Sequence, residues 1–193
     1  MQPKIILASS SPFRKELLSR LHLDFECHSP DIDEGQFAGE SASDYVCRLA
    51  EQKALAISSM YSDAVVIGSD QCALRDGLIL GKPGNHSNAL KQLKAAQGKV
   101  VVFHTGLCVL YPDTGFRDVD EVLFRVKFRH LSDEQLSHYL KVEQPYQCAG
   151  SFKSEGYGSC LFSAMEGGDP SALIGLPLIR LVSMLESAGV AVV

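Results

Sequence analysis

The stretch from residue 100 to residue 130 constrains the fold most strongly, because it holds two long strand-like segments separated by a turn. In the second segment, 121–130, apolar residues alternate with Arg125, Lys127 and Arg129. This period of two is typical of a β-strand with one apolar and one basic face. The turn sequence "PDTG" lies between the segments and predicts that they pair as a hairpin. The chain must therefore build a sheet that contains an antiparallel pair.

The rest of the chain alternates short apolar strands with amphipathic helices. The predicted strands are 4–9, 24–29, 63–70 and 78–83, and the predicted helices are 12–21, 42–61, 86–98, 132–141, 169–173 and 177–189. Ser132 and Gln135 predict a capping box at the start of helix 132–141. Because β–α units and a hairpin occur together without a linker, the sequence predicts a single domain, 1–193. Its fold class is α/β, with a mixed sheet and flanking helices.

Charge and hydropathy exclude several classes of partner. The net charge is −5, and acids and bases are scattered along the chain, which argues against a nucleic-acid or anionic-membrane surface. The longest apolar runs are too short to span a bilayer, and the N-terminus lacks the pattern of a signal peptide. The sequence therefore predicts a soluble, cytoplasmic protein. Its six cysteines show no CxxC spacing and are expected to be free and buried.

The stretch "ASSSPFRK", residues 8–15, joins the first strand to the first helix. Ser11 is the expected N-cap and Pro12 the first helical residue. Arg14 then occupies the first turn, where a cation opposes the helix dipole. A bound anion, phosphate above all, would remove this conflict. The alternative is a solvated arginine beside an ordinary cap, and the sequence leaves both open.

Four further segments carry polar groups suited to a nucleotide and a metal ion. Lys53 lies in the centre of an apolar helix stripe, so it either extends to solvent or faces an anion. Asp70 is expected just past the end of a strand, as a metal ligand, a base or a turn cap. Lys82 follows a glycine in "GKP". Asp33 and Glu34 offer hard oxygen ligands for Mg²⁺ or Mn²⁺, although loop acids are usually only solvated.

Seven motifs occur in an order that resembles the Maf family of nucleotide pyrophosphatases. They are "LASSSPFRKELL", "DIDE", "AEQKA", "GSDQ", "GKP", "CAGSFKSEGYG" and "GLPL". The resemblance covers nearly the whole chain. It implies an elongated α/β fold of the Maf/ITPase type, with two lobes around a central cleft. It also implies hydrolysis of a nucleoside triphosphate to the monophosphate and pyrophosphate, dependent on Mg²⁺ or Mn²⁺.

The resemblance further implies roles for single residues. Asp70 would act as the general base, and Glu34 would assist Asp70 in binding the metal. The residues implied to hold the phosphates carry a hydroxyl or a positive charge: Ser9, Ser11, Arg14, Lys53 and Lys82.

Three departures from the commonest family pattern, Phe13, Gln71 and Glu155, resemble the branch that hydrolyses 7-methyl-GTP. N7-methylation makes guanine cationic, and a cation gains from stacking on an aromatic face. A carboxylate accepts hydrogen bonds from guanine's ring donors, and an amide both donates and accepts. Alternatively, Phe13 packs in the core, since it shares a helix face with Leu17 and Leu21.

Two other functions stay open at this point. One keeps the enzyme but assigns dTTP, UTP or another modified nucleotide as its substrate. The other is a nucleotide-binding regulator of cell division without turnover. In each case the expected partner is a small nucleotide rather than a nucleic acid or a membrane. The oligomeric state is open, with a homodimer among the alternatives.

Overall fold

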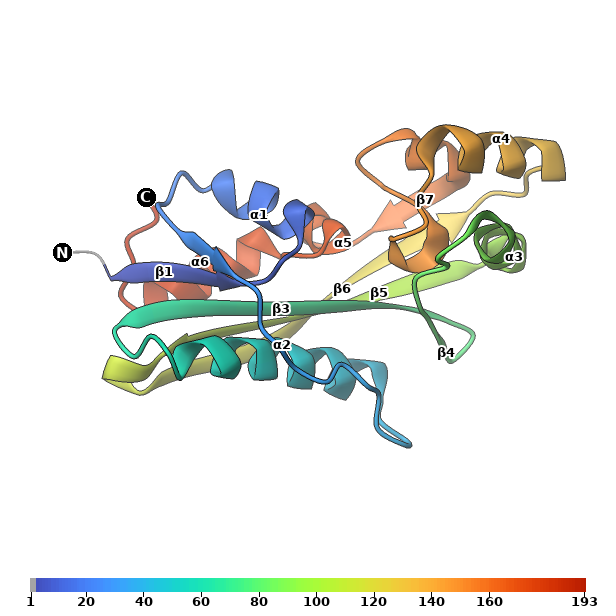
Figure 1. Cartoon of the computed structure of the whole chain (residues 1–193). Coiled ribbons are helices and arrows are strands. Elements are labelled where there is room, and N and C mark those ends of the chain that lie inside the picture. The colour runs from blue at the N-terminus through green and yellow to red at the C-terminus, as the bar shows by residue number, and fades with distance from the viewer. Residues whose placement is uncertain (1–2) are drawn as a thin grey trace. The chain divides into compact units, whose positions relative to one another are not determined.

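The computed structural model describes residues 3–193, which form a mixed α/β protein (Figure 1). The strands are β1 (Lys4–Ala8), β2 (Glu26–His28), β3 (Ala64–Arg75), β4 (Leu78–Leu80), β5 (Val100–Tyr111), β6 (Phe116–Phe128) and β7 (Phe162–Glu166). The α-helices are α1 (Pro12–Ser19), α2 (Ala42–Ser58), α3 (His86–Ala96), α4 (Asp133–Glu143), α5 (Pro170–Ile174) and α6 (Leu178–Ser187). Short 3₁₀ turns cover Pro112–Thr114, Ala149–Ser151 and Tyr157–Leu161. The predicted fold class, a mixed sheet with flanking helices, is confirmed.

The strands follow the order β2-β1-β3-β5-β6-β7, and β4 pairs with β3 outside this path. β1 is parallel to both β2 and β3, whereas the β3–β4 and β6–β7 pairs are antiparallel. The chain forms two compact units. Unit 1 holds the chain up to Gln71, Thr105–Val122 and Asp169–Val193, and unit 2 holds Cys72–His104 and Leu123–Gly168.

In unit 1 the two faces of the sheet bury different helices, because successive side chains of a strand point to opposite sides. Val65 and Ile67 of β3 belong to a core cluster with residues of α1 and α6, such as Leu17 and Leu181. Their neighbour Val66 belongs to a second cluster with α2. Figure 1 accordingly shows α2 on one side of β3, and α1 and α6 on the other.

Two glycines let α2 approach the sheet of unit 1 closely. A Cβ atom added to Gly68 of β3 would lie 2.0 Å from the carbonyl oxygen of Ala50. One added to Gly106 of β5 would lie 2.2 Å from the carbonyl oxygen of Val46. Both distances are far below van der Waals contact, so any side chain at these positions would push α2 away from the sheet.

Unit 2 has an aromatic core of its own. Phe152 contacts Phe103, Phe128 and Phe162 edge-to-face, with ring centroids 5.3, 5.7 and 4.8 Å away. Such pairs contribute roughly 0.5–1.5 kcal/mol each beyond their burial. α3 and α4 pack against each other in this unit. The capping box predicted at the start of α4 is confirmed, because Ser132 and Gln135 exchange both hydrogen bonds.

Two predicted strands, now β3 and β6, were wrong in extent, and one strand, β7, was missed. β3 does not end at Asp70 but continues to Arg75, because Ser69, Asp70 and Gln71 each find partners for their side chains within unit 1. β6 begins at Phe116, before the predicted start at residue 121. β7 was not predicted at all. Four of its five residues are exposed, so its sequence lacks the apolar run of a buried strand.

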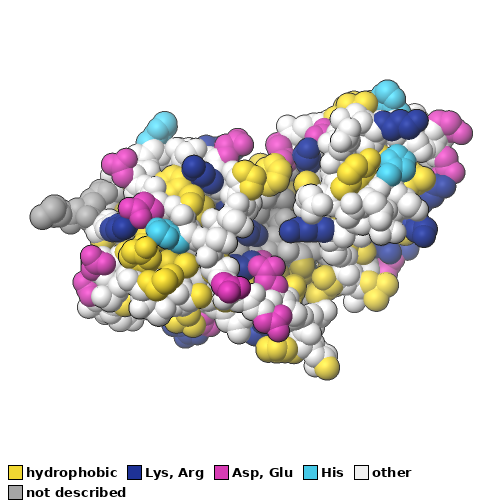
Figure 2. All heavy atoms as spheres, in the orientation of Figure 1, with side chains coloured by type: hydrophobic (Ala, Val, Ile, Leu, Met, Phe, Trp, Pro, Cys, Tyr) yellow, Lys and Arg dark blue, Asp and Glu magenta, His cyan; other side chains and the backbone are white. Residues whose placement is uncertain are grey.

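The predictions about cysteines and membrane-spanning segments can be compared with the structure. All six cysteines are free, as predicted, but Cys72 and Cys108 are buried whereas Cys27 is exposed. No helix within residues 3–193 is long and apolar enough to cross a membrane. Basic and acidic side chains are interspersed on the face shown in Figure 2, in agreement with their scatter along the sequence.

Candidate active site

Lys53 forms the centre of a buried charged cluster in unit 1. Its residue is 5% exposed, and its Nζ lies 2.6 Å from Glu34 Oε1 and 2.6 Å from Asp70 Oδ1. A lysine on the apolar stripe of α2 therefore does not extend to solvent but bridges two carboxylates. Of the two alternatives, extension to solvent is wrong, while the predicted contact of Lys53 with phosphate stays a prediction.

Asp70 reaches Lys53 because of its position in β3. It has the parity of Val66, which packs against α2, so its side chain points to the same side of the sheet. The Asp70 side chain is only 12% exposed, and Lys53 donates a hydrogen bond to its Oδ1. Two charges in such a site need this pairing, because an unpaired buried charge is strongly destabilising.

Ser11 caps α1, as predicted, and Pro12 is the first helical residue. The Ser11 hydroxyl accepts a hydrogen bond from the backbone N–H of Arg14, at 3.4 Å. Ser9 is buried, and its hydroxyl accepts from the backbone N–H of Ser11, at 3.1 Å. Both serines thus shape the turn before α1, and of the first helical residues only Phe13 has an N–H group without a partner inside the helix, because Pro12 has none and Ser11 binds that of Arg14.

Arg14 is half-buried at the start of α1, and its guanidinium binds the backbone of unit 1 rather than solvent alone, while its predicted contact with phosphate stays a prediction. Its Nε donates to the carbonyl oxygen of Gly175, at 2.8 Å. Burial lowers the pKa of Arg14, while the negative charges of Asp70 and Glu34 act to raise it. Arg14 therefore shares one electrostatic environment with the two carboxylates that Lys53 joins.

Gln71 points to the opposite side of β3 from Asp70, toward α5. Its Nε2 lies 2.7 Å from the carbonyl oxygen of Ala172, 3.1 Å from that of Leu173 and 3.0 Å from the Thr105 hydroxyl. α5 is closed by its C-cap Gly175, whose carbonyl oxygen accepts a hydrogen bond from Arg14. Gln71 thus fixes the short helix α5, and with it the position of Gly175.

The loop that carries Glu34 is attached to α2 by Arg48 and Tyr45. Arg48 pairs with both carboxylate oxygens of Glu40, at 2.6 and 2.8 Å, and donates to the carbonyl oxygen of Gly35, at 3.0 Å. Its guanidinium also lies over the ring of Phe37, 4.0 Å from the centroid. The Tyr45 hydroxyl donates to the carbonyl oxygen of Glu34, at 3.0 Å. Glu34 and Lys53 are therefore both placed by α2.

Phe13 is half-buried at the start of α1. Leu17 and Leu21 lie in or against the apolar cluster on this side of the sheet, and Phe13 is not among the described members of that cluster. The alternative that Phe13 is simply a core residue is thus not supported by its burial. Its predicted contact with a nucleotide base stays a prediction.

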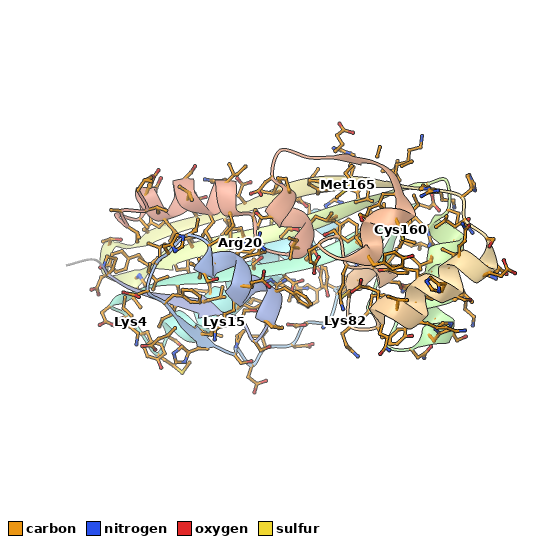
Figure 3. The ribbon with its side chains drawn as sticks, turned by 90° about the horizontal axis from the view of Figure 1, so that it is seen from above. Lys4, Lys15, Arg20, Lys82, Cys160 and Met165 are labelled. Carbon is orange, nitrogen blue, oxygen red and sulfur yellow. The ribbon has the colours of Figure 1, made fainter. Side chains whose placement is uncertain are left out.

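Lys82 and Glu155 belong to unit 2. Lys82 is exposed in the segment between β4 and α3, and Figure 3 labels it there. Glu155 is exposed in the segment before the 3₁₀ turn Tyr157–Leu161, and its carboxylate accepts from the Ser154 hydroxyl at 3.2 Å. Their predicted roles toward a nucleotide stay predictions.

The two carboxylates around Lys53 fit a Mg²⁺ ion of the kind that nucleotides bring with them. Mg²⁺ is commonly held by one or two protein carboxylates, with water and phosphate oxygens as the other ligands. Within residues 3–193, no group of three or more His, Cys, Asp or Glu side chains is placed to hold a metal ion. Glu34 and Asp70 therefore suit an ion whose remaining ligands come from substrate and water.

These observations define a class of protein. It is a mixed α/β protein in which a capped helix start, a half-buried arginine and a lysine between two carboxylates share one charged site. Positive side chains beside a helix start suit a phosphorylated ligand. Comparison with known proteins gives the family: the chain matches the Maf-like proteins over residues 4–188 and belongs to this family.

Curated relatives resemble the chain over its whole length. A protein of Methylobacillus flagellatus named 7-methyl-GTP pyrophosphatase is 53% identical over 191 residues, which cover 99% of this chain and 100% of the relative. One of Albidiferax ferrireducens with the same name is 48% identical over 192 residues, covering 100% and 96%. The solved structure of the Staphylococcus aureus Ham1 protein shares the fold, with a TM-score of 0.54 at 14% identity, covering 96% and 99%.

Sequence reasoning missed the residues that act through other residues. Arg48 and Glu40 hold the Glu34 loop, and Gly175 offers its carbonyl oxygen to Arg14. For Arg48 one signal was available: it lies one helical turn before Gln52, which is the neighbour of Lys53, on a helix whose sequence begins beside the acidic loop. Gly175 begins the motif "GLPL", but nothing in the spacing of the sequence points to its carbonyl oxygen.

Proposed function

We propose that this protein hydrolyses 7-methyl-GTP to 7-methyl-GMP and diphosphate with the help of a divalent cation. The observation that carries the proposal is the buried lysine bridging two carboxylates beside Arg14. The names of the full-length relatives support the choice of substrate. The six free thiols support a reducing compartment, and we place the reaction in the cytoplasm.

In this proposal Arg14 and Lys53 bind phosphate oxygens, and Lys82 adds a third positive charge. The hydroxyls of Ser9 and Ser11 and the backbone N–H of Phe13 at the start of α1 contribute hydrogen bonds. Phosphoryl transfer depends mainly on such positioning and charge stabilisation. Positive side chains that replace solvent next to the phosphates therefore lower the free-energy barrier of the hydrolysis.

Asp70 serves as the base. Its carboxylate takes the proton from the water that attacks the α-phosphorus, and the bond to the β-phosphate breaks as diphosphate leaves. Glu34 and Asp70 would hold the divalent cation, which when bound makes water more acidic and offsets phosphate charge. Lys53 holds both carboxylates in place, because its ammonium group lies 2.6 Å from an oxygen of each.

Base selection rests on Phe13 and Glu155, with Gln71 in a supporting place. The exposed part of the Phe13 ring suits stacking on the cationic methylated base. The exposed carboxylate of Glu155 suits the ring N–H donors of guanine. Since the Nε2 of Gln71 is engaged by α5 and Thr105, its Oε1 is the atom left for a nucleotide.

A nucleotide panel tests reaction and substrate together. Purified protein with Mg²⁺ or Mn²⁺ is incubated with 7-methyl-GTP, GTP, dTTP and UTP, and released diphosphate is quantified. We expect the highest kcat/KM for 7-methyl-GTP and no diphosphate in EDTA. Asp70→Asn is the control for catalysis. A preference for dTTP or UTP would assign the alternative substrates, and equal binding without turnover would leave only a nucleotide-binding role.

A further inference from the structure

The segment Lys153–Gly158, which carries Glu155, is fastened to α4 on both sides of that residue. The Tyr139 hydroxyl accepts a hydrogen bond from the backbone N–H of Lys153, at 3.2 Å. The Glu143 carboxylate accepts one from the backbone N–H of Tyr157, at 2.9 Å. These two anchors lie two residues before and two residues after Glu155. The backbone that presents its carboxylate is thus fixed at both ends.

Glu143 also binds Lys153, so its side chain holds the segment near both ends. Its Oε1 lies 3.1 Å from Lys153 Nζ, and Lys153 Nζ donates to the Glu143 carbonyl oxygen at 3.2 Å. The Glu143 side chain is only 16% exposed. Hydrogen bonds to an ionised acceptor in such a place are stronger than those between neutral groups.

The glycines of the segment bring its backbone against these anchors. A Cβ atom added to Gly156 would lie 2.9 Å from Glu143 Oε2. One added to Gly158 would lie 2.1 Å from the carbonyl oxygen of Lys153. The Tyr157 ring lies on that of Tyr139, with centroids 5.8 Å apart and an angle of 32°. Only a chain without side chains at both positions closes this tightly around Glu143.

The rest of the segment is fixed to the core of unit 2. Phe152, directly before Lys153, is 5% exposed and contacts three other aromatic rings. After it come the 3₁₀ turn Tyr157–Leu161 and β7, where Figure 3 labels Cys160 and Met165. Between these fixed parts, the turn at Glu155 is exposed and depends on the contacts with α4 for its shape.

The position of Glu143 is unfavourable for α4 itself. It is the last residue of that helix, where the dipole opposes a negative charge. Gln144 closes the helix in the left-handed conformation without using the Glu143 side chain. Both carboxylate oxygens serve the 153–158 segment instead. The placement of this acid is therefore explained by what it holds.

From this geometry we infer that Glu143 is a positioning residue for substrate selectivity: it holds the 153–158 segment so that the Glu155 carboxylate is preorganised for the methylated guanine. The inference rests on the proposed function, in which Glu155 accepts hydrogen bonds from the base. Preorganisation matters because a carboxylate that must first be ordered loses part of its binding free energy. Glu143 itself touches no substrate.

The test compares selectivity, defined as kcat/KM for 7-methyl-GTP divided by kcat/KM for GTP. The variants are Glu143→Ala, Glu143→Gln, Glu155→Gln and the double variant Glu143→Ala with Glu155→Gln. The matched control is Asp133→Asn, which removes an ion pair between the same helix and Lys94, 2.5 Å long, at a distance from the segment. Unfolding in urea checks that each variant is folded.

We expect Glu143→Ala to lower the selectivity about fivefold to tenfold, the size of effect that the loss of one ordinary hydrogen bond produces. The loss should appear in KM for 7-methyl-GTP, with kcat nearly unchanged. Glu143→Gln keeps an acceptor for the Tyr157 N–H and should lose less, and Asp133→Asn should lose nothing. The double variant should match Glu155→Gln, because Glu143 acts only through Glu155.

Two results would overturn the inference while leaving the proposed function in place. One is a lowered selectivity in Glu155→Gln together with an unchanged one in Glu143→Ala and Glu143→Gln. The other is a double variant whose loss is the product of the two single losses. If Glu143→Ala does not fold, Glu143→Gln carries the same comparison. Unchanged selectivity in Glu155→Gln would refute base recognition by Glu155, and this inference with it.

Discussion

Replacing Gly68 with alanine tests whether the close approach of α2 places Lys53 against Asp70. The new Cβ would lie 2.0 Å from the Ala50 carbonyl oxygen, whereas ordinary contact begins at 3.4 Å, so α2 must move by about 1.4 Å. Lys53 lies on this helix one turn after Ala50, and Asp70 lies on β3. Their hydrogen bond of 2.6 Å would lengthen toward 4 Å, beyond hydrogen-bonding range.

The expected cost appears in both stability and rate. Overpacking of this kind typically lowers the free energy of unfolding by about 1–3 kcal/mol. A displacement of about 1 Å at a catalytic group costs about a hundredfold in kcat. Urea unfolding followed by circular dichroism gives the first quantity, and diphosphate release from 7-methyl-GTP gives the second.

Gly168→Ala is the matched control, because a Cβ there would meet nothing within 4 Å. It should leave stability and kcat unchanged. A Gly68→Ala protein with the stability and kcat of the parent would refute the steric argument. A destabilised protein with unchanged kcat would refute the link between the helix position and Lys53. Gly106→Ala, with 2.2 Å to the Val46 carbonyl oxygen, should behave as Gly68→Ala does.

Three further changes have defined outcomes. Lys53→Met should reduce kcat at least about a thousandfold, because it removes the positive charge that pairs with Glu34 and Asp70 and leaves both carboxylates facing the phosphates; diphosphate release measures this loss. Arg48→Gln releases the 33–40 loop and should lower kcat about tenfold while hydrogen exchange in that loop rises; unchanged exchange would contradict it. Burial raises the pKa of the Cys108 thiol from 9.0 to about 12. The contribution of the protonated thiol to the free energy of unfolding is therefore present below pH 9 and is lost as the pH rises toward 12. Urea unfolding across this range should show a fall in stability that Cys108→Ala diminishes, and at pH 8 iodoacetamide should modify the exposed Cys27 but not Cys108.

The sequence predicts best those features that are encoded within a few residues. The caps at Ser11 and Ser132 were found because a capping side chain binds an N–H group three residues away. The alternation of buried and exposed residues placed most strands and helices. The end of β3 was missed because what continues the strand past Ser69 is distant in sequence: Gly106 and Thr105 supply the partners of its polar side chains.

The same division applies to the site. Lys53 stood out because a lysine on an apolar stripe needs an explanation, and the structure gives one in Glu34 and Asp70. The restraints on Arg14 and on the Glu34 loop are contacts between residues far apart in the chain or between a side chain and a carbonyl oxygen. A backbone acceptor has no signature in the sequence, because every residue carries one.

The charges of the described site explain why a divalent cation belongs to the proposed reaction. In unit 1 the two positive groups, Arg14 and Lys53, face two negative ones, Glu34 and Asp70, so this cluster is close to neutral by itself. A triphosphate brings roughly four negative charges and would leave such a cluster strongly negative. In the proposed reaction a divalent cation would supply two positive charges. On this balance, a metal ion does more than activate water: without it, the carboxylates needed for chemistry would repel the substrate that they act on.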